Sequence, residues 1–283
     1  MTILARSRTQ RTEPAEFDIR DHIDGAAAFY GATANVIMQL SLPPVGYGVA
    51  ESRVHSGSIM LHPIKRTRTT LTYLAVALMG TDADRAVYRT AVNGAHRHVH
   101  STADSPVKYN AFDKNLQMWV AACLFWGSED VMRRLHGPVD ESIADAFYEY
   151  AHYLGTTLQV PREMWPADRT AFAAYWTEHL ARTSIDPTIK AYFDKLLDLR
   201  MLSAPLRVPF ARFHRWFTTG LLPQHLRDEL GLTWNDRDEA RLNRLMRATG
   251  AVSGRMPRVI RNFPFNLTLA DMRRRHRKGK PLI

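Results

Sequence analysis

Apolar residues recur at three- and four-residue intervals along most of this 283-residue chain, the spacing of α-helices that bury one face. The first such pattern covers about residues 23–42 and ends at Pro43 and Pro44, because proline removes a backbone donor and clashes with the preceding turn. No segment has the period-two alternation, bounded by hairpin residues, that predicts β-strands. The sequence therefore predicts an all-α protein of roughly a dozen helices with one hydrophobic core.

Polar and glycine residues divide the middle of the chain into predicted helices. Residues 64–80 predict a helix that is polar at its start and apolar later. Thr81 and Asp84 have the spacing of a capping box, so the next helix is expected from Thr81 to about Ser101. Another helix is expected after Asp113, ending at Gly127. The last long helix is expected at residues 235–250.

Composition indicates an ordinary globular protein with an excess of positive charge. No linker rich in Gly, Ser or Pro divides the chain, so we expect a single domain. The expected parts are a mobile N-terminal segment (1–20), one helical domain (21–267) and a basic C-terminal tail (268–283). The net charge of +10 is concentrated near the two ends, at Arg6, Arg8, Arg11 and RRRHRKGK (273–280).

Charge runs at chain ends are more often solvated than bound to a partner. Weak contact of the basic tail with a membrane surface stays as an alternative. A nucleic-acid partner is not expected, because no helix-turn-helix, zinc-finger or RNP pattern is present. The oligomeric state does not follow from the sequence.

Several classes are excluded by missing motifs. Cys123 is the only cysteine, which rules out an internal disulfide, and no C-x-x-C-H for covalent haem attachment occurs. Phosphate-binding glycine loops and the G-x-S-x-G elbow are also missing. The longest apolar run (74–79) is too short to span a bilayer, and no signal-peptide pattern precedes it. We expect a cytoplasmic protein.

The three histidines His96, His98 and His100 form the only dense histidine cluster. On a continuous helix His96 and His100 would share one face, and His98 would point away from it. Three interpretations remain open from these residues alone. The pair could bind a non-haem metal, a single histidine could ligate haem iron, or the cluster could be a polar helix end.

A basic and hydroxyl-rich run, KRTRTT, occupies residues 65–70. Arg66 and Thr70 are four residues apart and share a helix face. Positive charge near a helix N-terminus is unfavourable, which favours a functional reason for its placement. A guanidinium and a hydroxyl could hold an anion or an oxygen ligand, for example a haem propionate or iron-bound dioxygen.

Five blocks of sequence follow one another between about residues 25 and 265. They are QLSLPPVGYGVAES (39–52), RTRTTLTYLAVALMG (66–80), VNGAHRHVHS (92–101), YNAFDKNLQMWV (109–120) and GLLPQHLRDELGLTWNDRDEARL (220–242). In this order they resemble the oxygenase family of MpaB and latex-clearing protein catalytic domains. Each block alone is weak, and the order of all five is what makes the resemblance specific.

The resemblance implies an all-α, partly globin-like fold with non-covalent haem b (iron) and dioxygen as co-substrate. It implies His96 as the axial iron ligand, Arg66 and Thr70 on the opposite side of the haem, and Glu51 as a base-like acid. Rubber-cleaving members have a lysine where Thr69 stands. The family's further histidines, near Leu42, Ser52 and Ala121, are absent here.

We therefore expect a haem-dependent oxygenase, a dioxygenase rather than a monooxygenase, that oxidises or cleaves a hydrophobic unsaturated or aromatic small molecule. Arg66, Thr70 and Glu51 are the expected catalytic residues, with His96 and Arg66 as cofactor-binding residues. The alternative is a haem- or ligand-binding sensor or carrier without turnover.

Overall fold

The computed structural model describes residues 17–283, so most of the expected mobile segment, including Arg6, Arg8 and Arg11, lies outside the described residues. Residues 17–283 form fifteen α-helices, three 3₁₀ helices and no sheet, which confirms the all-α class. The elements are η1 (Ile19–Asp21), α1 (Gly25–Leu40), α2 (Pro43–Ala50), η2 (His55–Gly57), α3 (Pro63–Met79), α4 (Asp82–His96), α5 (Lys114–His136), α6 (Glu141–Tyr150), α7 (Tyr153–Thr156), η3 (Arg162–Met164), α8 (Arg169–Leu180), α9 (Pro187–Leu197), α10 (Ala204–Arg207), α11 (Ala211–Gly220), α12 (Gln224–Leu230), α13 (Asp236–Ser253), α14 (Arg258–Arg261) and α15 (Phe265–Arg277).

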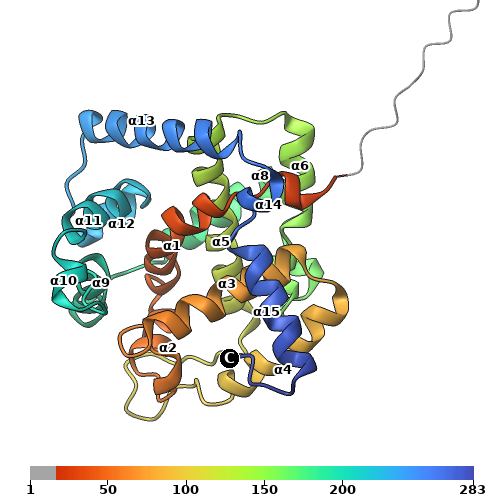
Figure 1. Ribbon diagram of the computed structural model, residues 1–283. Helices are drawn as coiled ribbons and strands as arrows, with labels where there is room; N and C mark the ends of the chain where they lie inside the picture. The colour runs from red at the N-terminus through yellow and green to blue at the C-terminus, as the bar shows by residue number, and fades with distance from the viewer. Residues whose placement is uncertain (1–16) are drawn as a thin grey trace, which may run out of the picture.

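Helix α5 runs through the middle of the molecule, with α1 and α13 packed against it (Figure 1). Its residues 121–125 are all buried. Two side-chain hydrogen bonds join α1 to α5: the Asn35 amide donates to the Cys123 carbonyl (2.7 Å), and the Trp119 indole donates to the Gln39 carbonyl (3.1 Å). Both partners of each bond are buried or partly buried, so these bonds fix the position of α1 as well as stabilising it.

The expected end of a helix at Gly127 is wrong, because α5 continues to His136. Gly127 lies where α1 crosses α5. A Cβ at this position would lie only 2.4 Å from the amide nitrogen of Asn35 and 3.2 Å from the terminal methyl of Met38. The glycine therefore gives α1 room to approach α5 closely, and does not end the helix.

The basic segment at the C-terminus is a packed helix and not a solvated tail. Helix α15 packs on α3 and buries Leu269 and Met272. Arg273 forms an ion pair with Asp84 at the start of α4 (2.6 Å). At the other end of the chain, Ile19 is also buried in the core. The expectation failed because a run of arginines hides the apolar residues spaced at three and four along the same helix. None of the described helices combines the length and apolar composition needed to cross a bilayer.

Removing the Arg273–Asp84 pair should weaken the attachment of α15. Hydrogen bonding from Arg273, helped by hydrogen bonds from Thr81 and opposed by burial, lowers the pKa of Asp84 to about 2 from its usual value of 3.8. A depressed carboxyl pKa stabilises the fold above pH 3.8, and the stabilisation is lost as the pH falls towards 2. Because Arg273 is partly exposed, we expect Arg273→Gln to cost about 1 kcal/mol at pH 7. Urea unfolding at pH 7 and pH 2.5 measures this, and an equal cost at both pH values would contradict it.

Candidate active site

Arg66 and Thr70 lie one turn apart in the first half of α3, as the spacing predicts. The helix starts at Pro63, whose fixed φ and missing N–H suit the first helical position. The basic run divides between two sides: Arg68 reaches Asp271 of α15 (3.9 Å), whereas the Arg66 guanidinium forms no ion pair or hydrogen bond within residues 17–283. Arg66 is thus a cation without a counter-charge in the part of the chain that the structure describes.

The surroundings of Arg66 combine water access with desolvation. Arg66 is exposed to solvent, yet the protein atoms packed around its guanidinium lower the pKa of that group, and Tyr192 and Tyr88 only partly oppose the shift. The exposed area shows that water reaches the guanidinium, so its loss of hydration is only partial. Arg66 therefore lies at a solvent-accessible position near Tyr88 and Tyr192 and within the electrostatic reach of His96.

The hydroxyl of Thr69 is already hydrogen-bonded within α3. Its Oγ1 donates to the Arg66 carbonyl (3.0 Å), and its own carbonyl accepts from the Tyr88 hydroxyl (2.8 Å). The position that carries lysine in rubber-cleaving members is therefore tied into α3 and to α4.

His96 is the last residue of α4. Its Nδ1 is buried and has no hydrogen-bond partner in the described structure. Burial, and secondarily the charge of Arg66, lowers the pKa of His96 to about 4. The ring also lies edge-on to Phe112, with centroids 6.2 Å apart. His96 is therefore neutral at pH 7, the form that ligates metals, and it lies within the electrostatic reach of Arg66.

The other two histidines do not join His96. Helix α4 ends at His96 and not near Ser101, so the premise that His96 and His100 share a helix face is wrong. The chain turns after His96 and enters an isolated antiparallel bridge between His100 and Asn110. His98 and His100 are exposed, and the His100 ring lies 3.2 Å from the Ser101 carbonyl. Backbone pairing with residues 109–111 ends the helix early.

Glu51 follows α2 as its C-cap and is exposed. Its Oε2 accepts hydrogen bonds from the Ser105 hydroxyl (2.7 Å) and the Tyr109 hydroxyl (2.9 Å). This carboxylate therefore anchors the segment between the bridge residues His100 and Asn110. Within residues 17–283, the Glu51 carboxylate forms no hydrogen bond or ion pair with Arg66 or His96.

The donor set of this site fits haem better than a metal held by several side chains. Within the described residues, no group of three or more His, Cys, Asp or Glu side chains is placed to hold a metal ion. A haem iron needs only one protein ligand, since the porphyrin supplies four nitrogens. A single neutral imidazole with an unpaired buried nitrogen, near an unpaired guanidinium, matches that requirement.

Sequence reasoning missed three aromatic residues of this site. Tyr192 on α9 and Tyr88 on α4 lie near Arg66, and Phe112 lies against His96. Each reads in the sequence as one more apolar position, because only the packing of α9 and of the 97–113 loop brings them to the site. The one available signal was that Phe112 belongs to the block YNAFDKNLQMWV.

Fold and site together describe an all-helical protein in which Arg66 of α3, His96 of α4 and Tyr192 of α9 lie near one another. The chain belongs to the family described as "ER-bound oxygenase mpaB/B'/Rubber oxygenase, catalytic domain", which matches residues 19–251. Two uncharacterized proteins, from Mycobacterium bovis and Mycobacterium tuberculosis, are each 46% identical over 250 residues, spanning 88% of this chain and 98% of theirs. No solved structure matches this chain. The resemblance seen in the sequence is thereby confirmed, and the chain is an oxygenase-family catalytic domain.

Proposed function

We propose that this protein is a haem b-dependent oxygenase that uses dioxygen to oxidise or cleave a hydrophobic unsaturated or aromatic small molecule. The observation that carries the proposal is His96, a neutral histidine with a buried unpaired nitrogen beside an unpaired arginine. Among residues 17–283, neither the His96 Nδ1 nor the Arg66 guanidinium has a hydrogen-bond or ion-pair partner. Dioxygenation is favoured over monooxygenation through the family resemblance, and a cytoplasmic location remains our expectation from the sequence.

In this proposal His96 would hold the haem iron, and Arg66 and Thr70 would bind and orient dioxygen. Bound haem supplies the capacity to bind and reduce dioxygen. Arg66 would contribute a fixed positive charge, and haem and substrate bound beside it would exclude water, so that the charge would act more strongly on a developing negative charge than in water. Thr70, one turn along the same helix face, can supply a hydroxyl donor. The aromatic rings of Phe112 and Tyr192 make the surroundings suitable for an apolar substrate.

The direct test is reconstitution of the purified protein with haem. We expect a Soret band at one haem per chain, and oxygen uptake when olefinic or aromatic hydrophobic compounds are added. A protein that takes up no haem under these conditions contradicts the proposal. Stoichiometric haem binding without oxygen uptake across a broad substrate panel supports the alternative, a sensor or carrier.

Replacing Arg66 by glutamine should lower the rate of oxygen uptake by about 100-fold, the size of effect found for one preorganised donor in a transition-state site. The haem content should stay near that of the wild type, because the iron ligand is intact. Arg66→Lys, which keeps a charge without the planar fork, should recover part of the rate. Loss of haem in Arg66→Gln would instead assign Arg66 to a propionate.

Glu51 can be tested as a proton-transferring group separately from its anchoring role. Glu51→Gln keeps the side-chain shape and retains one acceptor oxygen for Ser105 and Tyr109. If Glu51 moves a proton, the variant should lose about 100-fold in kcat. Tyr109→Phe removes one anchoring hydrogen bond and leaves the carboxylate. Equal losses in both variants would assign Glu51 to holding the loop alone.

A further inference from the structure

A second feature of the molecule is a basic segment that contains no acidic residue. Residues 241–270 hold no Asp or Glu, and their six arginines are Arg241, Arg244, Arg247, Arg255, Arg258 and Arg261. They belong to α13, α14 and the turns beside them, and none of them takes part in the site around His96. We call the exposed part of residues 241–267 the α13–α14 surface.

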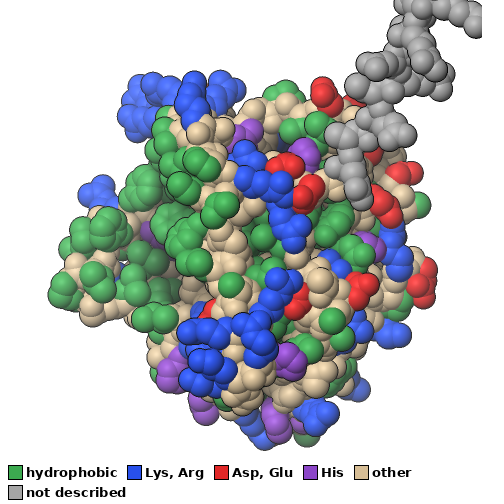
Figure 2. Space-filling model, turned by 45° about the vertical axis from the view of Figure 1, so that its right-hand side comes forward, with side chains coloured by type: hydrophobic (Ala, Val, Ile, Leu, Met, Phe, Trp, Pro, Cys, Tyr) green, Lys and Arg blue, Asp and Glu red, His purple; other side chains and the backbone are tan. Residues whose placement is uncertain are grey.

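The same surface exposes an unusual number of large apolar side chains. These side chains are between 38% and 72% exposed: Val252, Met256, Val259, Ile260, Phe263 and Leu267. Isolated apolar residues are normal on a protein surface, but a contiguous group marks an interaction site. Figure 2 shows hydrophobic side chains gathered on the outside of the molecule next to clusters of Lys and Arg.

Aromatic contacts extend this surface to α11. Phe29 on α1, 81% exposed, adjoins Tyr30, whose hydroxyl lies 3.2 Å from Thr249 of α13. Tyr30 stacks on Phe217 (centroids 4.6 Å apart), and Phe217 adjoins the half-exposed Phe213. The adjoining segment 200–213 also contains no acidic residue. Its exposed apolar residues are Leu206, Val208 and Phe210, and its arginines are Arg200, Arg207 and Arg212.

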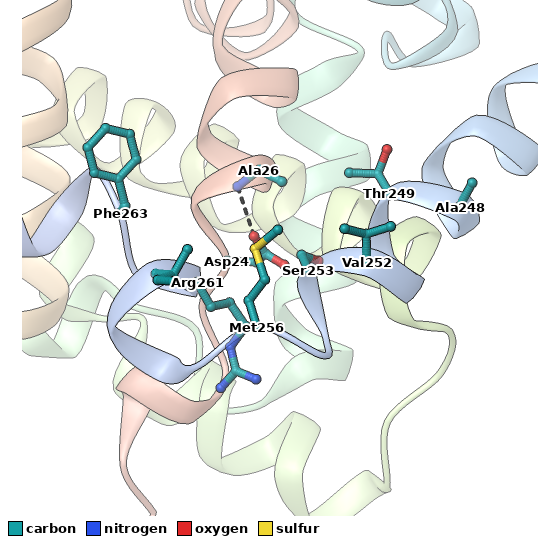
Figure 3. Close-up of a pocket in the computed structure, with 10 residues that line it drawn as sticks. Asp24, Ala26, Ala248, Thr249, Val252, Ser253, Met256, Arg261 and Phe263 are labelled. Carbon is teal, nitrogen blue, oxygen red and sulfur yellow. Dashed lines mark hydrogen bonds between the residues drawn. The ribbon is translucent and has the colours of Figure 1, made fainter.

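A hollow of about 450 Å³ lies within the α13–α14 surface (Figure 3). Its lining is mostly apolar, with Val252, Met256 and Phe263 on the side of α13 and α14. Asp24 also lines the hollow, but its carboxylate already has two protein partners. It accepts a hydrogen bond from the Ala26 amide (2.8 Å) and pairs with His136 (3.0 Å). The hollow thus offers an apolar lining with arginines around it.

The arginines of this surface are mostly not neutralised by the protein. Arg258 pairs with Asp18 and Asp21, and the other five form no ion pair within residues 17–283. The C-terminal run differs, since Arg273 pairs with Asp84 and both Arg274 and Arg275 pair with Asp271. The free positive charge therefore lies on the α13–α14 surface rather than on that part of α15.

We propose that the α13–α14 surface docks on an anionic phospholipid bilayer. Exposed apolar side chains combined with arginine are the composition of interfacial segments, which place apolar groups at the acyl boundary and cations at the headgroups. A protein partner would have to supply a matching acidic and apolar face, whereas an anionic bilayer supplies both properties everywhere. The surface uses none of the residues assigned to haem, so this proposal stands independently of the proposed function.

Flotation with vesicles tests this on the full chain. Wild type should float with vesicles of phosphatidylcholine containing phosphatidylglycerol, bind pure phosphatidylcholine more weakly, and dissociate as salt is raised. Val259→Ser/Ile260→Ser should lower the partition coefficient about tenfold or more by removing two exposed apolar groups. Arg247→Glu/Arg255→Glu should lower binding to anionic vesicles selectively. All four positions are exposed, so these variants should remain folded, which circular dichroism checks.

Matched controls change the same kinds of residue elsewhere. Val139→Ser is about as exposed as Ile260, and Lys114→Glu reverses an exposed charge at the start of α5. Both should bind vesicles like the wild type. Three outcomes would overturn the proposal: no vesicle binding by the wild type at low salt; equal losses in the control variants; or light scattering that shows a dimer converted to monomer by Val259→Ser/Ile260→Ser, which would make this surface a contact between two copies of the chain.

Discussion

His96→Ala is expected to remove the Soret band and reduce oxygen uptake to the background rate, while leaving the helical circular dichroism unchanged. The fold should tolerate the change because the Nδ1 of His96 has no hydrogen-bond partner to lose. Haem held by a single axial ligand should lose most of its affinity when that ligand is removed. Absorbance at reconstitution, with oxygen uptake on the same sample, measures both effects.

Two controls separate iron ligation from general damage. His98→Ala changes an exposed histidine two residues away and should behave like the wild type. His96→Gly with added imidazole should recover part of the Soret band, since free imidazole can occupy the space of the missing ring. A His96→Ala protein with full haem content and activity would contradict the assignment of His96 as the iron ligand.

Gly250→Ala should destabilise the protein by about 3 kcal/mol, the upper part of the range for overpacking. Gly250 on α13 faces the end of α5, where an added Cβ would lie 1.9 Å from the Leu135 carbonyl oxygen and 2.5 Å from its carbon. These are backbone atoms, which cannot rotate away as a flexible side chain can. Because α13 packs on α5, the helices themselves must separate.

Gly94→Ala is the matched control for this stability change. Gly94 also lies within an α-helix, but no atom lies within 4 Å of a Cβ built there. Alanine should therefore stabilise α4 by about 0.5–1 kcal/mol, since it restricts the unfolded chain more than glycine does. Urea unfolding of both variants without haem measures the two effects. Equal free energies of unfolding for Gly250→Ala and wild type would show that α13 can shift away from α5 at little cost.

The sequence predicted most of the helices but misjudged the residues whose meaning depends on a neighbour. The capping box of Thr81 and Asp84 is confirmed, because its partners lie within one turn of the same chain segment. The sequence indicates a helix end at Gly127, because the contact that requires glycine there comes from Asn35 of α1, which is distant in the sequence. Likewise the sequence indicates a tail at α15, because its apolar face has a clear role only once α3 is seen to pack against it.

The sequence predicts those parts of the site that depend on a local pattern of residues. The four-residue spacing of Arg66 and Thr70 survives in α3, and His96 is placed near Arg66. The pairing of His96 with His100 failed because the chain leaves the helix after His96 to form the bridge at Asn110. Tyr192 could not be assigned to this site from the sequence, since it lies on α9, almost a hundred residues after His96.

The bridge between His100 and Asn110 also bears on how easily the site opens. Ser101 donates to the Tyr109 carbonyl (2.9 Å) and Ala111 donates to the Val99 carbonyl (2.9 Å), and Glu51 adds its two hydrogen bonds from outside. Closing so short a loop costs little chain entropy, so these few bonds suffice to hold it. These bonds can break while α5 stays folded. The loop beside Phe112 and His96 can therefore open locally without unfolding of the whole protein. The amide hydrogens of Ser101 and Ala111 should therefore exchange with solvent much faster than those of buried α5 residues. The rate at which large apolar molecules reach the site would then depend on the opening of this loop and not on the stability of the whole fold.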